Sequence, residues 1–109
     1  MHELALTENI LATITERLGD ARVVRVRLEI GRLMAVLPDA MRFAFAVCTK
    51  DTSLDGARLE IDEVAARGRC RDCASELALD GVVALCPCGS ADVELLAGQE
   101  LQIKEVEVA

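Results

Sequence analysis

Apolar positions in the first part of the chain recur with the period of a helix. Within residues 3–19 they form a stripe whose members are mostly three, four or seven positions apart, and Gly19, a typical helix stop, follows it. Such spacing places the apolar side chains on one helix face. The stripe consists of Leu4, Leu6, Ile10, Leu11, Ile14 and Leu18. It predicts an amphipathic helix over residues 3–19.

Apolar and polar residues alternate in three later segments, which predicts strands. Residues 22–30 alternate most regularly, and residues 57–63 place Leu59 and Ile61 on one face. Residues 100–108 are also β-like, but their apolar phase slips between Ile103 and Val106, as a bulge or a twisted edge would produce. In the first strand we expect an inward face of Val24, Val26, Leu28 and Ile30, and an outward face of Arg25, Arg27 and Glu29.

A second helix is predicted over residues 38–52, because Pro38 suits a first helical turn. It joins the first two strands, which favours a parallel pair. The element order predicts an α+β fold, in which two helices pack on a small mixed three-stranded sheet. Residues 65–93 interrupt this pattern, since they hold four of the five cysteines and few large apolar residues. They are predicted to form an inserted module.

Composition restricts the classes of partner. The chain has 109 residues, enough for one small domain, and a net charge of -7 with almost no aromatic residues. Nucleic acid binding needs a basic face and stacking platforms, so we expect none. No apolar run approaches the length of a membrane span, and no signal peptide is recognisable, which makes the cytoplasm the expected location. In a reducing compartment, clustered cysteines indicate metal or redox chemistry rather than structural disulfides.

Cys70, Cys73, Cys86 and Cys88 form two close pairs separated by a short segment. This is the layout of a structural zinc site, in which each tight turn supplies two corners of a tetrahedron. A segment so poor in large apolar groups would gain its folding energy from the metal. The alternatives are a redox disulfide pair and four reduced thiols without a ligand role. Cys48 stands apart on the second predicted helix, and we interpret it as a packed thiol.

The only histidine of the chain is His2. The Met1 α-amine, the His2 amide and the His2 imidazole can close fused chelate rings around one ion, and such a nitrogen plane suits Ni(II) or Cu(II). Glu3 can add an oxygen. Against this, a helix begins close by and its positive end disfavours a cation. A histidine at position 2 by chance is the alternative.

Taken together, these features resemble the HypA/HybF family of hydrogenase nickel-incorporation proteins, over nearly the full length. The resemblance rests on the segments MHEL, LEIGRL, FAF, GARLEI, the C-x-x-C pair, CPCGS and GQELQIKEVEV. It implies a nickel-binding α/β domain of residues 1–64 and 94–109 and a structural zinc-binding module, zinc-ribbon-like, of residues 65–93. It also implies that Met1, His2 and Glu3 bind nickel.

The resemblance further implies a metallochaperone that works with a HypB-like partner GTPase. Its cargo, Ni(II), goes to the precursor of the [NiFe]-hydrogenase large subunit, and some members also serve urease. The sequence departs from the family in one place. In this family the second cysteine pair usually has the sequence C-P-x-C, whereas CPCGS is one residue shorter. If the shorter pair supplies only one zinc ligand, Asp72 and Asp92 are candidate substitutes for the other.

We expect no enzymatic activity, because no catalytic triad can be assembled with a sole histidine near the terminus and no phosphate-binding glycine loop is present. Two other functions remain open. One is a zinc-ribbon adaptor whose terminal histidine is incidental, and the other is a thiol redox protein.

Overall fold

The computed structural model describes residues 2–79 and 86–109, and its chain divides into two compact units. The first unit contains the chain up to Glu29, Val36–Asp62 and Gln102–Ala109, and the second contains Ile30–Ala35 and Glu63–Leu101. In the described part of the chain, neither α-helix has the length and apolar content to cross a membrane.

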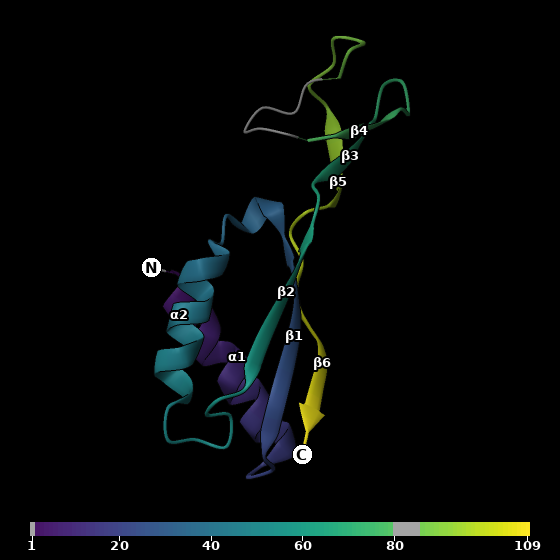
Figure 1. Cartoon of the computed structure of the whole chain (residues 1–109). Coiled ribbons are helices and arrows are strands. Elements are labelled where there is room, and N and C mark those ends of the chain that lie inside the picture. The colour runs from purple at the N-terminus through teal and green to yellow at the C-terminus, as the bar shows by residue number, and fades with distance from the viewer. Residues whose placement is uncertain (1, 80–85) are drawn as a thin grey trace. The chain divides into compact units, whose positions relative to one another are not determined.

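The first unit has two helices, α1 (His2–Leu18) and α2 (Pro38–Thr49), on one face of a three-stranded sheet (Figure 1). The sheet has the order β2-β1-β6, with β1 at Val23–Gly31, β2 at Arg58–Val64 and β6 at Leu101–Val108. A short 3₁₀ helix, η1, follows β1 at Arg32–Met34. The predicted α+β fold with two helices and a small sheet is thus confirmed.

Strand directions follow from the pairs that join neighbouring strands. Side-chain hydrogen bonds link Arg25 to Glu60 and Arg27 to Asp62, and both pairs are 35 residues apart in sequence. Because the partner on β2 advances as the residue on β1 advances, β1 and β2 are parallel. The chain at the start of β1 instead bonds the end of β6, since Ala109 N–H donates to the Arg22 carbonyl, which makes β6 antiparallel. The sheet is therefore mixed, as the helix between its first two strands predicted.

The core of the first unit is a single apolar layer between the helices and the sheet. The side chains of this layer come from both helices and from the strands β1 and β2, and each is at most 8% exposed. The layer contains Ile10, Ile14, Val26, Leu28, Met41, Phe45 and Leu59. Fully burying one such side chain stabilises a fold by about 1.5–3 kcal/mol, so this layer is what fixes α1 and α2 on the sheet.

Three details of the predicted elements are wrong. Leu4 and Leu18 are 43% and 37% exposed, because the buried stripe of α1 is centred on residues 7, 10 and 14 and leaves them at its margins. In β1, Val24 is exposed and Val23 is buried, since Val23 N–H bonds Ser53 in the loop after α2 and this loop covers the start of the strand. Helix α2 ends three residues early, because Lys50 leaves the helical region with ψ 131°.

The second unit contains a small antiparallel sheet of order β4-β3-β5. Its strands are β3 (Arg67–Cys70), β4 (Glu76–Ala78) and β5 (Val93–Ala97), and residue pairs such as Arg69 with Glu76 and Cys70 with Val93 fix their register. The hydrophobic pattern did not predict these strands. The assignment of residues 65–93 as a structural zinc-binding module stays a prediction.

Two segments that carry the family resemblance meet within this second unit. Gly31 N–H donates to the Glu100 carbonyl and Leu33 N–H donates to the Gly98 carbonyl, each at 2.8 Å. A Cβ atom on Gly31 would lie 2.1 Å from the Gly98 carbonyl carbon. Gly98 itself has φ +120°, a conformation that only glycine adopts readily. These two positions therefore require glycine.

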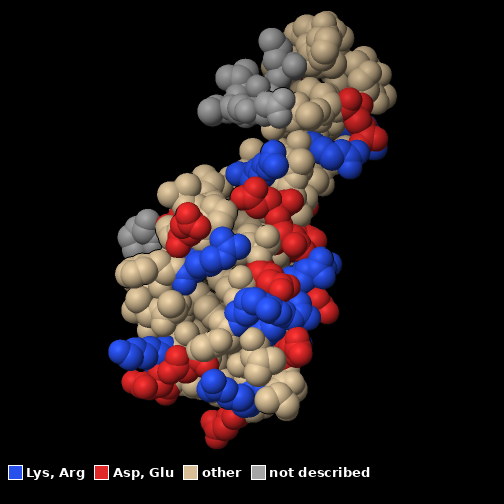
Figure 2. Space-filling model, viewed as in Figure 1, with Lys and Arg blue, Asp and Glu red and all other residues tan. Residues whose placement is uncertain are grey.

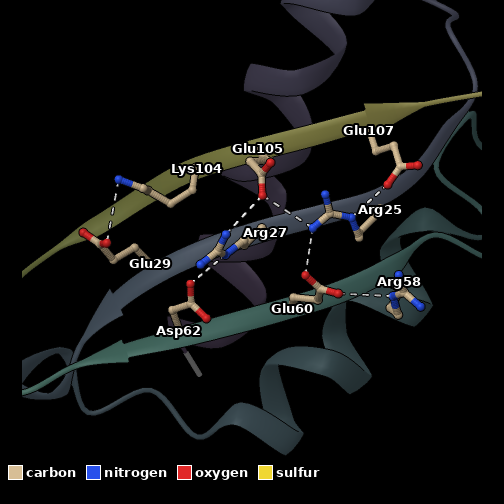
Figure 3. A network of polar contacts seen from close by, with 9 residues as sticks. All are labelled: Arg25, Arg27, Glu29, Arg58, Glu60, Asp62, Lys104, Glu105 and Glu107. Atoms are coloured by element: carbon tan, nitrogen blue, oxygen red, sulfur yellow. Dashed lines mark hydrogen bonds and ion pairs between the residues drawn. The ribbon is translucent and has the colours of Figure 1, made fainter.

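The face of the first sheet that points away from the helices carries a lattice of ion pairs (Figure 3). Two arginines on the central strand β1 lie between acidic side chains on both outer strands, and Figure 2 shows basic and acidic groups interspersed on the side in view. Arg25 bonds Glu60 at 2.8 Å and Glu107 at 2.9 Å. Arg27 bonds Asp62 at 2.7 Å and Glu105 at 3.2 Å. The outward face of β1 is thus neutralised within its own sheet.

Glu105 should stabilise the fold only while it is ionised. The hydrogen bond from Arg27, followed by the charge of Arg25, lowers the pKa of Glu105 below its ordinary value of 4.5. A lowered folded-state pKa contributes stability above the unfolded-state value, and this is lost as the pH falls through the folded-state value. We expect the difference in unfolding free energy between wild type and Glu105→Gln to be full at pH 7 and to vanish in acid. Urea unfolding at several pH values measures it, with Glu16→Gln on the exposed side of α1 as control. A difference independent of pH would contradict the role of the charge.

Candidate metal centres

The four clustered cysteines come together in the second unit. Their sulfur atoms all lie within 4.8 Å of one another, and no other group of metal-ligating side chains occurs among the residues described. The Cys70 and Cys88 sulfurs are 3.6 Å apart, and those of Cys73 and Cys86 are 3.5 Å apart. Two sulfurs on one tetrahedral zinc are separated by about 3.8 Å, given a Zn–S distance of about 2.3 Å. The cluster therefore fits a tetrahedral thiolate site.

The first cysteine pair lies on a turn that follows β3. Ala74 N–H donates to the Cys70 carbonyl at 2.8 Å, and Cys70 N–H donates to the Ser75 carbonyl at 2.9 Å. Closing the turn requires the left-handed conformation at Ala74, whose φ is +64°. These bonds hold the Cys70 and Cys73 side chains on the same side of the turn.

The second pair uses the same scheme with one residue fewer. Gly89 N–H donates to the Cys86 carbonyl at 2.9 Å, and Cys86 N–H donates to the Ser90 carbonyl at 2.9 Å. Gly89, like Ala74, has a positive φ, here +96°. The loop closes between residues three apart, whereas the first turn closes between residues four apart. A C-x-C pair thereby presents two sulfurs as the C-x-x-C pair does.

The two candidate substitute ligands do not join the cluster. Asp92 accepts a hydrogen bond from Arg71 at 2.9 Å, and Asp72 is exposed on the first turn and is not among the grouped metal-ligating side chains. The sequence left the fourth ligand open because it could not show how the shorter turn closes. In the structure, four sulfurs are available without either carboxylate.

Cys73 and Cys86 differ in the direction in which their surroundings shift the thiol pKa. Hydrogen bonds from the Ser75 side chain and backbone, and then from Cys86, lower the pKa of Cys73 to about 6. The backbone N–H of Cys88 acts to lower the pKa of Cys86, but burial and the neighbouring sulfurs raise it to about 12. Ionisation of Cys73 is thus favoured and ionisation of Cys86 is opposed. A divalent cation would reverse this, since it binds thiolates and displaces their protons.

The predicted amino-terminal site falls partly outside the described residues. Met1 and the His2 side chain lie outside them, whereas the backbone of His2 is the first residue of α1. Glu3 follows in the first turn, and its Oε2 accepts a hydrogen bond at 3.1 Å from the backbone N–H of Leu37, the residue before α2. No pattern in the sequence indicates this contact, because residues 34 positions apart meet only through the packing of α1 on α2.

Cys48 does not belong to the cysteine cluster. It lies on α2, in the first unit, and is half-buried. The four clustered cysteines all lie in the second unit. Cys48 therefore has no part in the tetrahedral set.

Comparison with known proteins finds one family over nearly the whole chain. A family model described as "Hydrogenase/urease nickel incorporation, metallochaperone, hypA" matches residues 1–108. The hydrogenase maturation factor HypA of Nostoc punctiforme is 51% identical over 99% of this chain and 96% of its own length. The HypA of Geotalea uraniireducens is 50% identical over 99% of both chains.

Solved structures support the same fold. The solution structure of the Ni metallochaperone HypA from Helicobacter pylori superposes with a TM-score of 0.67 over 99% of this chain and 97% of that one, at 22% identity. A second solution structure of a HypA protein gives a TM-score of 0.70 at 21% identity, covering 100% and 97% of the two chains. With a family match over nearly its full length and relatives at half identity, the chain belongs to the HypA family of hydrogenase nickel-incorporation metallochaperones.

Proposed function

We propose that this protein binds Ni(II) as cargo at its amino terminus and delivers it to the precursor of the [NiFe]-hydrogenase large subunit. The observation that carries the proposal is the family match together with the sole histidine at position 2. The proposed ligands are the Met1 α-amine, His2 and Glu3. The protein would act in the cytoplasm without catalysis of its own, and GTP hydrolysis would belong to a HypB-like partner.

The start of α1 is chemically suited to coordination by a backbone amide. The first four N–H groups of a helix have no acceptor within the helix. Because α1 begins at His2, replacing the His2 amide proton by a metal breaks no helical hydrogen bond. The anionic amide nitrogen would also offset the unfavourable interaction between a cation and the positive end of the helix dipole.

Glu3 would serve this site in two ways. Its Oε2 already accepts the Leu37 N–H, which ties the first turn of α1 to the start of α2. A carboxylate has several lone pairs on two oxygens, so it can keep that bond and still offer an oxygen to nickel. Nickel would then be bound next to a fixed main chain rather than on a loose end.

We propose that Cys70, Cys73, Cys86 and Cys88 hold a structural Zn(II). The support is the tetrahedral spacing of the four sulfurs and a donor set made only of thiolates, which zinc accepts in closed structural sites. Bound zinc would supply folding energy to a unit that buries few large side chains. With four protein ligands the metal has no open position, so we assign it no role in nickel binding.

Loss of any cysteine of the cluster should release the zinc. For Cys86→Ala and Cys88→Ala we expect less than one zinc per chain and an unfolded second unit, while the α1, α2 and β1 signals of the first unit persist, because the apolar layer of the first unit does not depend on the cysteine cluster. Elemental analysis and NMR spectra measure the two effects. Cys48→Ser is the matched control and should keep full zinc. Full zinc in either cluster variant would exclude the C-x-C pair as two ligands.

Removing the His2 imidazole should abolish specific nickel binding. We expect His2→Ala to lose it in nickel titration calorimetry, with zinc content and thermal unfolding unchanged, because the two proposed sites use different donors. A short extension before Met1 should have nearly the same effect, since it converts the α-amine into an amide. Wild-type nickel affinity in His2→Ala would show that nickel binds elsewhere.

Nickel affinity should fall on mild acidification while zinc persists. A free imidazole has a pKa of about 6.5 and an α-amine of about 7.7–8.0, and both must lose their proton to bind metal. Binding should therefore weaken progressively from about pH 8 to about pH 6. Thiolates committed to zinc stay deprotonated over this range. Nickel titrations with zinc assays in parallel test this. A constant nickel affinity between these pH values would rule out the amine and imidazole and point to carboxylates or thiols.

A further inference from the structure

Thr7 is a buried polar residue in the apolar layer of the first unit. Its relative exposure is 0%, and it lies on the buried face of α1 beside Ile10 and Ile14. The Thr7 hydroxyl donates to the Glu3 carbonyl at 2.8 Å and lies 3.5 Å from the sulfur of Met41 on α2. A hydroxyl at such a position is costly unless it is hydrogen-bonded. The fold alone would be served by valine, which has nearly the same shape.

The residue that accepts the Thr7 hydrogen bond, Glu3, is one of the proposed nickel ligands. Glu3 is held at two points, because its carbonyl accepts the Thr7 hydroxyl and its carboxylate accepts the Leu37 N–H. One of these bonds fixes the main chain and the other fixes the side chain. Both meet at the residue that follows His2 directly. The first turn of α1 is thereby pinned to the apolar layer and to α2.

We propose that Thr7 is a positioning residue for the nickel site: its hydroxyl fixes the main chain at Glu3, so that the terminal donors are presented from a rigid support. This inference rests on the proposed function. Metal donors attached to a fixed residue lose less conformational freedom when they bind an ion, so their affinity for the ion is higher. Thr7 would act through Glu3 and would not touch nickel.

Helix α1 also contains a matched control. Thr13 makes the same kind of bond, from its hydroxyl to the Asn9 carbonyl at 2.9 Å, but it is exposed. It lies more than one helical turn beyond Thr7. Thr13→Val removes the same chemical group from the same helix without touching the first turn. Any general effect of losing a threonine hydroxyl on α1 will appear in this variant.

The decisive comparison uses Thr7→Val and Thr7→Ser in the full-length, zinc-loaded protein. Valine keeps the packed shape and loses the hydroxyl, and the Glu3 carbonyl still accepts the helical N–H of residue 7. Serine keeps the hydroxyl and loses a buried methyl group. A role limited to stability predicts that serine is the more harmful change. A positioning role predicts the reverse for nickel.

Four variants are compared with wild type: Thr7→Val, Thr7→Ser, Thr13→Val and His2→Ala. For each we would measure nickel affinity by titration calorimetry, zinc content, and stability by urea unfolding. We expect Thr7→Val to weaken nickel binding about five- to ten-fold, the affinity equivalent of one hydrogen bond, with full zinc and near wild-type stability. Thr7→Ser should bind nickel within about two-fold of wild type but unfold more easily. Thr13→Val should match wild type in nickel affinity.

Several results would overturn the inference. These are unchanged or tighter nickel binding by Thr7→Val, equal losses in Thr7→Val and Thr13→Val, and affinities that simply follow stability in all variants. The His2→Ala protein separates this inference from the function beneath it. If His2→Ala loses nickel while Thr7→Val does not, only the positioning role fails. If His2→Ala binds like wild type, the amino-terminal site itself is refuted, and the positioning role with it.

Discussion

Burial of one aliphatic layer between two helices and one face of a sheet is the interaction on which the first unit depends. The chain has no Trp or Tyr and only two Phe residues, so Leu, Ile, Val and Met supply nearly all of its apolar area. With only one face of the sheet covered, the other face must be polar. The lattice of arginines and carboxylates meets this requirement, and it pairs its charges inside the sheet instead of leaving them for a partner.

The second unit has no comparable layer in its described part. Ile30 is the one large side chain buried there, and the other buried residues are Gly31, Ala66, Gly68, Cys70, Cys86 and Gly98, two of which are cysteines of the cluster. In the proposed function, a metal bound by four sulfurs that lie within 4.8 Å of one another would cross-link this unit and supply the stability that a larger core gives elsewhere. The two turns that present these sulfurs share one hydrogen-bond scheme, and the shorter turn shows that the scheme tolerates the deletion that makes CPCGS unusual.

Much of the fold and of the cysteine cluster could be predicted because the patterns are local. Helical period, strand alternation and paired cysteines each act over a few residues, and the five predicted helices and strands lie close to their expected ranges. The errors arise where tertiary packing decides. Val23 is buried by a distant loop, and the strands β3–β5, each of three to five residues, are too short to show a period. The contacts of Glu3 with Leu37 and of Thr7 with Met41 depend on helix packing and leave no mark in the sequence.

These long-range contacts give the amino terminus a property that a terminal tripeptide lacks. Chain ends are usually poorly ordered, and a disordered end must lose its freedom each time it binds an ion. Here the third residue is already bonded through both its main chain and its side chain, so in the proposed function Glu3 would add little to the ordering cost of binding nickel. A carrier must bind its cargo firmly and also release it. In the proposed function, donors at the chain end would stay open to a second set of ligands, whereas four thiolates around one ion would leave it no free position. The same protein would thus keep one metal and hand over another.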